Sequence, residues 1–296
     1  MNWTFERVAG PFKGRTGGLA WDGQAMLFSV VQEERVLRLE PSSGRIIEFR
    51  KYTGRTNGIT MAADGSVFGA QEGGRRVIRF LPDGSTVPTC DLLDGQHHNQ
   101  PTDLVLDRNG HVWFADPYNP VLPFGPDGIF PYLEHASVLR LERDASGRWT
   151  LVRVTCDTQA PRALAFSLDQ SILYVADGDA ERGGGPCTLR AYHLDSQGHV
   201  QTSQVLHYFA GADRGIEGLC IDGRGLIVAC GGWAAGGPGP RLMLFSPSGE
   251  LLAEHPAPTD LPMRCAFGGA NLEDIYLTTG TGEVFRAQGT GLRGCT

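Results

Sequence analysis

One acidic and two basic residues stand at or next to the starts of apolar runs in this 296-residue chain, and their chemistry suits reaction with an ester or binding of an anion. Glu217, Arg162 and Arg264 each stand at the beginning of an apolar run. A partly buried glutamate with a raised pKa serves as a general base, and an arginine fork binds carboxylate or phosphate or stabilises an oxyanion. The alternatives are an ion pair between Glu217 and Arg162, which would lower the pKa of Glu217, and charge balance for Arg264 by Asp103.

Neutral polar residues stand at the equivalent places in two other runs. Asn57 and Thr102 are expected to orient a polar substrate, or else to cap local backbone. Asp103, beside Thr102, is a further candidate substrate contact, with a turn or a contact between repeats as its alternative. His98 is a candidate proton shuttle near neutral pH, as is its neighbour His97; a solvated loop histidine is the alternative for either.

Several other chemistries lack their sequence signals. The chain has no GxSxG motif, no glycine-rich phosphate loop after a strand and no HExxH motif. Cys220 lies inside an apolar run, which favours a buried thiol over a nucleophile. The seven cysteines are odd in number and form no CxxC pair, so we expect free thiols in a reducing cytosol.

A repeated frame positions the candidate residues. It consists of a polar or small residue, an apolar run, a turn and a second apolar run, as in residues 215–230. The frame starts at residues 17, 57, 102, 162, 217 and 263, and a third apolar run follows in most copies. Six copies at this period predict an all-β fold, a single six-bladed β-propeller over residues 1–296.

The last repeat lacks a clear fourth strand. It contains runs at 275–278 and 283–286 and then ends, whereas the run Trp3–Val8 precedes the first repeat. A closed ring removes exposed sheet edges. We therefore expect the N-terminal strand to complete the last blade beside Glu283–Arg286.

Three connections between second and third strands are long, and they lie at the end where the repeats start. They cover residues 117–136, 178–187 and 231–240 and contain Tyr118 and Trp233, both candidate substrate contacts. Long loops gathered at one end of a rigid scaffold commonly serve binding. Packing between blades is the alternative.

Composition excludes some classes of partner. The net charge is −7 without a Lys/Arg cluster, which argues against nucleic acid and anionic membranes. No stretch approaches 18 consecutive apolar residues, so no membrane span is expected. The first residues lack the features of a signal peptide, and we expect a cytoplasmic location.

Taken together, these stretches resemble the six-bladed propellers of the regucalcin/gluconolactonase/luciferin-regenerating-enzyme family. The similarity rests on 17–21, Arg55–Thr60, Asn99–Asp103, Leu173–Asp177 and 266–269. It implies hydrolysis of a lactone or a related ester. It also implies one divalent metal at the mouth, held by a Glu, two Asn and an Asp from the repeat starts.

The implied metal ligands are largely replaced in this chain. The corresponding positions hold Gly17, Thr102, Arg162 and Glu217, and a late Asn position of the family holds Arg264. Hard divalent cations need several oxygen ligands, and an arginine stays charged at any usable pH. We therefore expect no cofactor and no divalent metal such as calcium or zinc.

The sequence thus predicts a lactonase-like hydrolase of a small, anionic substrate that works without the family metal. Glu217 would act as base, and Arg162 or Arg264 would polarise the carbonyl. One alternative is metal-free condensation, cyclisation or isomerisation, as in the similar strictosidine-synthase-like propellers. A non-catalytic small-molecule-binding propeller is another, and the oligomeric state is left open.

Overall fold

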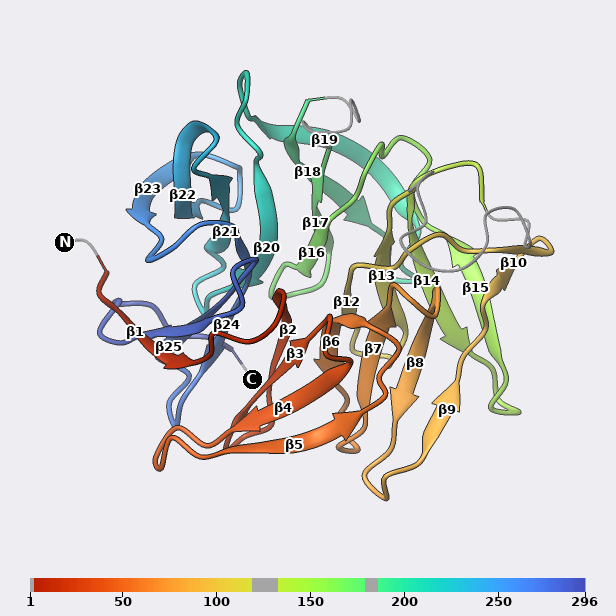
Figure 1. The fold of residues 1–296 in the computed structure, drawn as a ribbon. Coiled ribbons are helices and arrows are strands. Elements are labelled where there is room, and N and C mark those ends of the chain that lie inside the picture. The colour runs from red at the N-terminus through yellow and green to blue at the C-terminus, as the bar shows by residue number, and fades with distance from the viewer. Residues whose placement is uncertain (1–2, 119–132, 179–185, 296) are drawn as a thin grey trace.

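The computed structural model describes residues 3–118, 133–178 and 186–295, and all of its regular elements are β-strands (Figure 1). Six four-stranded antiparallel sheets follow one another around a central axis, with one short additional hairpin. The innermost strands of successive sheets are neighbours, and the last contacts the first, so the ring is closed. The predicted six-bladed propeller is confirmed. No helix occurs in the described ranges, hence none that could cross a membrane.

The blades take their strands in chain order from the axis outward, apart from the outermost strand of blade 6. Blade 1 consists of β2 (Thr16–Trp21), β3 (Met26–Val30), β4 (Arg35–Leu39) and β5 (Ile46–Lys51). Blade 2 consists of β6 (Thr56–Met61), β7 (Val67–Gln71), β8 (Arg76–Phe80) and β9 (Thr86–Pro88). Blade 3 consists of β12 (Asp103–Leu106), β13 (Val112–Asp116), β14 (Ser137–Arg143) and β15 (Trp149–Arg153).

Blades 4 to 6 follow the same plan. Blade 4 consists of β16 (Ala163–Phe166), β17 (Ile172–Asp177), β18 (Thr188–Leu194) and β19 (Val200–Tyr208). Blade 5 consists of β20 (Ile216–Ile221), β21 (Ile227–Trp233), β22 (Gly236–Phe245) and β23 (Leu251–Pro256). Blade 6 consists of β24 (Pro262–Gly268), β25 (Asp274–Thr279), β26 (Val284–Ala287) and β1 (Phe5–Ala9). The extra hairpin pairs β10 (Leu92–Leu93) with β11 (Gln96–His97).

Aspartate-containing turns shape the hairpins at the end of the blades opposite the strand starts. In the turn after β20, Asp222 Oδ1 accepts backbone hydrogen bonds from Arg224 (2.9 Å) and Leu226 (2.8 Å). Gly225 takes a φ of +85°, which disfavours a side chain. Aspartate side chains that bond the backbone two residues ahead favour such turns, so this local chemistry sets the hairpin period.

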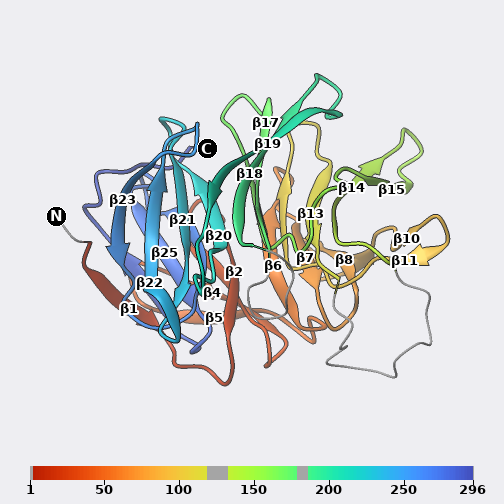
Figure 2. The same cartoon turned by 90° about the horizontal axis from the view of Figure 1, so that it is seen from above.

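The N-terminal strand closes the ring as predicted. β1 runs antiparallel to β26, with Phe5 opposite Ala287 and Arg7 opposite Phe285. In Figure 2, β1 lies at the outer edge of the last blade. The strand is also anchored by packing, because the Trp3 ring stacks on His255 at 4.1 Å between centroids.

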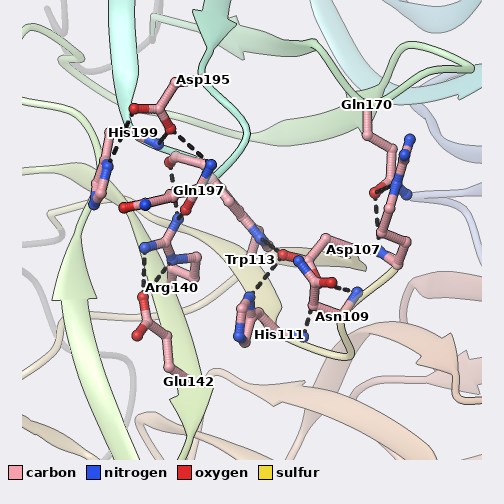
Figure 3. A network of polar contacts seen from close by, with 12 residues as sticks. Asp107, Asn109, His111, Trp113, Arg140, Glu142, Gln170, Asp195, Gln197 and His199 are labelled. Atoms are coloured by element: carbon pink, nitrogen blue, oxygen red, sulfur yellow. Dashed lines mark hydrogen bonds and ion pairs between the residues drawn. The ribbon is translucent and has the colours of Figure 1, made fainter.

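Apolar faces of neighbouring blades form the core, and polar ties add to them. Figure 3 shows such a tie between blades 3 and 4. Arg140, from β14, donates to the carbonyl of Gly198 at 2.8 Å and lies 4.8 Å from the Trp113 ring. Asp107 accepts from the Trp113 indole at 3.0 Å. Side chains thus join blades that share no backbone ladder.

Deletion of residues 1–10 should lower thermal stability, because it exposes the edge of β26 and the apolar surface under β1. Losing the burial of even two apolar side chains costs about 3–6 kcal/mol, so we expect the melting temperature to fall by roughly 10 °C. The matched control is Glu6→Ala in the same strand, whose side chain is 68% exposed. Calorimetry showing equal melting of the truncated and full-length proteins would contradict this role.

Candidate active site at the mouth of the propeller

The starts of the innermost strands converge at one end of the axis, called the mouth here. Blades 1, 2, 5 and 6 have an irregular register at this point, between Thr16 and Leu19, Thr56 and Ile59, Ile216 and Gly218, and Pro262 and Arg264. Such irregularities re-aim side chains and are frequent next to active sites. Here they coincide with the candidate residues Asn57, Glu217 and Arg264.

Close approach of the strands at the mouth requires small residues. A Cβ at Gly18 would lie 2.3 Å from the Ile59 nitrogen, and one at Gly218 would lie 2.7 Å from Arg264 Cα. Two of the six equivalent positions carry long side chains, Asp103 and Arg264; the others are Gly18, Gly58, Ala163 and Gly218. Asp103 and Arg264 come from blades 3 and 6, which face each other across the ring.

The Arg264 guanidinium lies on this axis and bonds the backbone of several blades. It donates to the carbonyls of Thr102 at 3.0 Å, Arg162 at 3.4 Å and Met263 at 2.8 Å, and also to that of Glu217. Its side chain is 6% exposed. These contacts describe a framework role, and a substrate contact by Arg264 stays a prediction.

Asp103 provides the counter-charge to Arg264. Its Oδ1 lies 3.3 Å from Arg264 Nε, and its Oδ2 accepts from the Leu164 nitrogen at 3.3 Å. Burial raises the pKa of Asp103 and outweighs the opposing effects of Arg264 and of two backbone hydrogen bonds. The contact between repeats that was the alternative for Asp103 is therefore present.

Glu217 is held by two arginines in a cluster named the Glu217 triad, Arg162–Glu217–Arg214. Arg214 Nε donates to Glu217 Oε1 at 2.7 Å, and Arg162 bonds the same oxygen. Burial by itself would raise the pKa of Glu217, but Arg162, Arg214 and Arg264 outweigh it and lower the pKa. The ion pair that was the alternative for Glu217 is thus formed, without the raised pKa that would favour a general base.

Arg214 is a site residue that sequence reasoning missed. It precedes the repeat start, and the only signal is its position three residues before Glu217. Its guanidinium carbon lies 5.6 Å from the centre of the Trp233 ring, and the Trp233 indole donates to the Ala212 carbonyl at 3.1 Å. Trp233 therefore reaches the triad through Arg214.

The segment that carries Trp233 differs from its prediction. Residues 231–240 were expected to form a long loop, but most of them extend the hairpin of β21 and β22, with Trp233 opposite Gly236. The glycine and proline residues of this segment suggested a loop. In the structure, β21 and β22 continue as paired strands, and this pairing satisfies backbone hydrogen-bonding groups of the segment.

Asn57 and Thr102 lie at the mouth as predicted. Asn57 is 4% exposed, and in the described ranges its Oδ1 has no hydrogen-bond partner. Its carbonyl accepts from Ser29 Oγ at 2.6 Å. The Thr102 hydroxyl donates to the Arg162 carbonyl at 3.2 Å and so ties blade 3 to blade 4.

His98 is not brought into contact with the Glu217 triad by any described interaction. Its side chain is fully buried, with the ring edge-on to Phe114 at 5.2 Å and Nδ1 3.6 Å from Asp116 Oδ1. It is therefore no solvated loop residue, which was its alternative. His97 lies 3.5 Å from Asp91 in the β10–β11 hairpin.

Tyr118 is 39% exposed and follows the mouth end of β13. It is the last described residue before 119–132. That segment and 179–185, which make up much of the two other predicted long loops, lie outside the described residues.

The residues at the implied metal positions do not fit a divalent cation. A Cβ at Gly17 would lie 2.7 Å from Ser29 Oγ and 2.8 Å from Asn57 Oδ1, so a carboxylate there would not fit without displacement. Arg162 places a permanent cation on Glu217. In residues 3–118, 133–178 and 186–295, no group of three His, Cys, Asp or Glu side chains is arranged to hold a metal.

A family model described as the SMP-30/Gluconolactonase/LRE-like region matches residues 16–281. Because the match spans every blade, the chain belongs to this family of lactonase-like propellers. The resemblance inferred from the sequence is confirmed.

Named relatives support this membership. The gluconolactonase of Zymomonas mobilis subsp. mobilis is 29% identical over 226 residues, covering 72% of this chain and 58% of that protein. The 6-deoxy-6-sulfogluconolactonase of Pseudomonas putida is 33% identical over 124 residues, 42% of this chain and 39% of that protein. The pentonolactonase of Haloferax volcanii is 22% identical and covers 88% and 82%. The match thus spans less than two thirds of the first two relatives.

Solved structures share the fold. A gluconolactonase from Xanthomonas campestris superposes with a TM-score of 0.78 at 24% identity, covering 97% of this chain and 89% of that one. A luciferin-regenerating enzyme gives a TM-score of 0.76 at 20% identity, covering 99% and 98%. At these identities the likeness establishes the propeller and no activity.

Replacing Arg264 by methionine should destabilise the protein, because it breaks the bonds to three other blades and leaves Asp103 buried without its counter-charge. Removing one partner of a buried pair typically costs about 3–5 kcal/mol. Urea unfolding measures the loss, and the exposed Arg45→Met serves as control. The double variant Arg264→Met/Asp103→Asn should recover part of the stability, and an unchanged unfolding midpoint for Arg264→Met would refute the framework role.

The pH dependence of stability should change in Glu217→Gln. Because the pKa of Glu217 is lowered in the folded protein, its ionised form stabilises the fold above the ordinary value of 4.5, and this stabilisation is lost as the pH falls through the folded pKa. The unfolding free energy of Glu217→Gln should therefore decrease less below pH 4.5 than that of the wild type. Parallel curves would show that Glu217 is not paired in solution.

Proposed function

We propose that the protein hydrolyses the cyclic ester of a small anionic lactone, without the divalent metal that the family implies. The observation that carries this proposal is the Glu217 triad, a buried carboxylate shared by two arginines at the mouth. Lactonase names among the relatives support the reaction class, and one of them, the sulfogluconolactonase, names an anionic sugar lactone.

The carbonyl end of the lactone would lie against Arg162 and Arg214. Their side chains are 14% and 16% exposed, so part of each side chain is accessible. Negative charge develops on the carbonyl oxygen when water adds to the carbon. Fixed N–H donors aimed at that oxygen stabilise the transition state, which is the role that a metal would otherwise fill.

Glu217 would accept the proton of the attacking water. Both arginines bond Oε1, and within the described residues no hydrogen bond engages Oε2. The lowered pKa keeps the carboxylate ionised at neutral pH but makes it a weaker base, so the arginines must supply more of the rate enhancement. Water adds to the carbonyl carbon, the ring C–O bond breaks, and the proton on Glu217 passes to the leaving alkoxide to give a hydroxy acid.

A non-catalytic binding protein is the second candidate, because an ion-paired glutamate with a lowered pKa also suits a purely structural site. In that case the mouth would bind an anion and turn nothing over. Condensation, cyclisation or isomerisation stays an untested alternative without a particular observation in its favour.

The seven cysteines are all free thiols, which supports the reducing cytosol as the proposed location. Cell fractionation with a compartment marker tests this. Recovery of the protein in an oxidising compartment would overturn it.

Glu217→Gln should lower the turnover number for a hydrolysed lactone by about 10²–10⁴-fold, the usual contribution of a general base. Its matched control is Glu250→Gln, at an exposed glutamate.

Arg214→Met should lower kcat/KM through the loss of oxyanion stabilisation, by up to about 10²–10³-fold. A panel of neutral and acidic sugar lactones provides the assay. Full turnover by Glu217→Gln, at wild-type stability, would leave Glu217 as an ion-pair partner only.

Dialysis against a chelator should leave hydrolysis unchanged, because arginines occupy the place of the implied metal ligands. Elemental analysis of the purified protein should then give less than one divalent ion per chain. Loss of turnover with the chelator and recovery on adding calcium or zinc would overturn the metal-free proposal.

A further inference from the structure

We infer that the cluster Arg15–Glu72–Arg55, named the Glu72 triad, is a second anion-binding subsite that holds an acidic group of the substrate remote from the lactone carbonyl. The inference rests on the proposed function in one respect, the assignment of the lactone carbonyl to the Glu217 triad and of the remote acidic group to the Glu72 triad. The ligand class is a polyhydroxylated lactone with a phosphate, sulfonate or carboxylate at the far end of its carbon chain.

The Glu72 triad resembles the Glu217 triad in its residue types and in spanning two adjacent blades, although its arginines bond different oxygens of the glutamate. Arg55 donates to Glu72 Oε1 at 3.2 Å, and Arg15 bonds Oε2. Arg55 belongs to the blade of Glu72, and Arg15 to the preceding blade. In the Glu217 triad, Arg214 and Arg162 stand in the same relation to their glutamate.

All three residues lie at the mouth. Arg15 directly precedes β2, Arg55 directly precedes β6, and Glu72 directly follows β7, whose end pairs with the start of β6. The side chains of Arg15, Arg55 and Glu72 are 27%, 17% and 10% exposed, so both arginine side chains are more exposed than the glutamate between them.

The two triads face each other across the axis. The Glu72 triad joins blades 1 and 2, and the Glu217 triad joins blades 4 and 5, which are opposite positions in a closed ring of six. The side chain of Arg264 alone reaches from blade 6 to Asp103 and Thr102 of blade 3, so facing strand starts lie within the length of one arginine side chain. On this spacing we place the two ends of one sugar-sized molecule at the two triads.

Charge and hydrogen bonding match an acidic sugar. Two guanidinium groups around one carboxylate give the Glu72 triad a net positive charge, in a protein whose net charge is −7. Planar arginine forks bind phosphate, sulfonate and carboxylate oxygens in pairs. Asn57, two residues after Arg55, has a buried Oδ1 with no partner among the described residues, so this end of the axis also holds an unsatisfied hydrogen-bond acceptor.

Binding of open-chain acids tests the subsite without hydrolysis. The probes are 6-phosphogluconate and glucarate, compared with gluconate by calorimetry at one ionic strength. The wild type should bind the two doubly acidic probes at least about tenfold more tightly, and Arg15→Met should reduce that preference about tenfold or more, the usual effect of losing a charge-assisted bond. Arg45→Met, at an exposed arginine far from the mouth, should keep the preference.

Steady-state kinetics separate this inference from the proposed function. The ratio of kcat/KM for 6-phosphogluconolactone over gluconolactone should fall in Arg15→Met and Arg55→Met. Arg55→Lys keeps the charge and loses the fork, so it should give an intermediate ratio and serves where Arg55→Met is too unstable to assay. Selective binding of the doubly acidic probes without hydrolysis of any lactone would refute the lactonase and leave the subsite standing. Hydrolysis with no preference for acidic substrates, or with a preference unchanged in the variants, would overturn the subsite and reduce the Glu72 triad to a tie between blades.

Discussion

The placement of one guanidinium on the propeller axis governs the rest of the site. Arg264 bonds carbonyls of Thr102, Arg162 and Glu217, which are three of the positions where the family resemblance implies metal ligands. Its charge is permanent, and the Asp103 carboxylate balances it from the opposite blade. A buried charge must be paired and hydrogen-bonded to be tolerated. The inner strands must therefore keep this arrangement for the fold to be stable.

The chemistry of the mouth follows from that constraint. With cations fixed at Arg162, Arg214 and Arg264, Glu217 stays ionised although burial opposes its charge. Such a site attracts negative charge and would stabilise it as it develops on a substrate. The same positive charges oppose the binding of a divalent cation here. On the inference above, selection among anionic ligands would depend on the blades across the ring, where the Glu72 triad also sets two arginines around one glutamate.

Closure and turn chemistry support this site from a distance. β1 completes blade 6, the blade that carries Arg264, and the aspartate turns set the lengths of the hairpins. Three buried or half-buried thiols, Cys220, Cys230 and Cys265, fill the space between blades 5 and 6, with 3.8 Å between the sulfurs of Cys220 and Cys265. The inner strands are thus held from behind as well as across the axis.

The sequence by itself determined the propeller, the number of blades and the closing strand, because apolar alternation, turn residues and repeat period are local properties. It also placed Glu217, Arg162, Asn57 and Thr102 at one end. Only the tertiary structure decided which side chains meet, since these contacts join distant segments: Arg264 bonds Thr102, 162 positions away, and Arg15 bonds Glu72, 57 away. Arg214 and the Glu72 triad stand outside the repeated frame, so the frame did not include them. The depth of Arg264, and hence its backbone partners, depends on a register irregularity in β24 that the pattern of residue types does not encode.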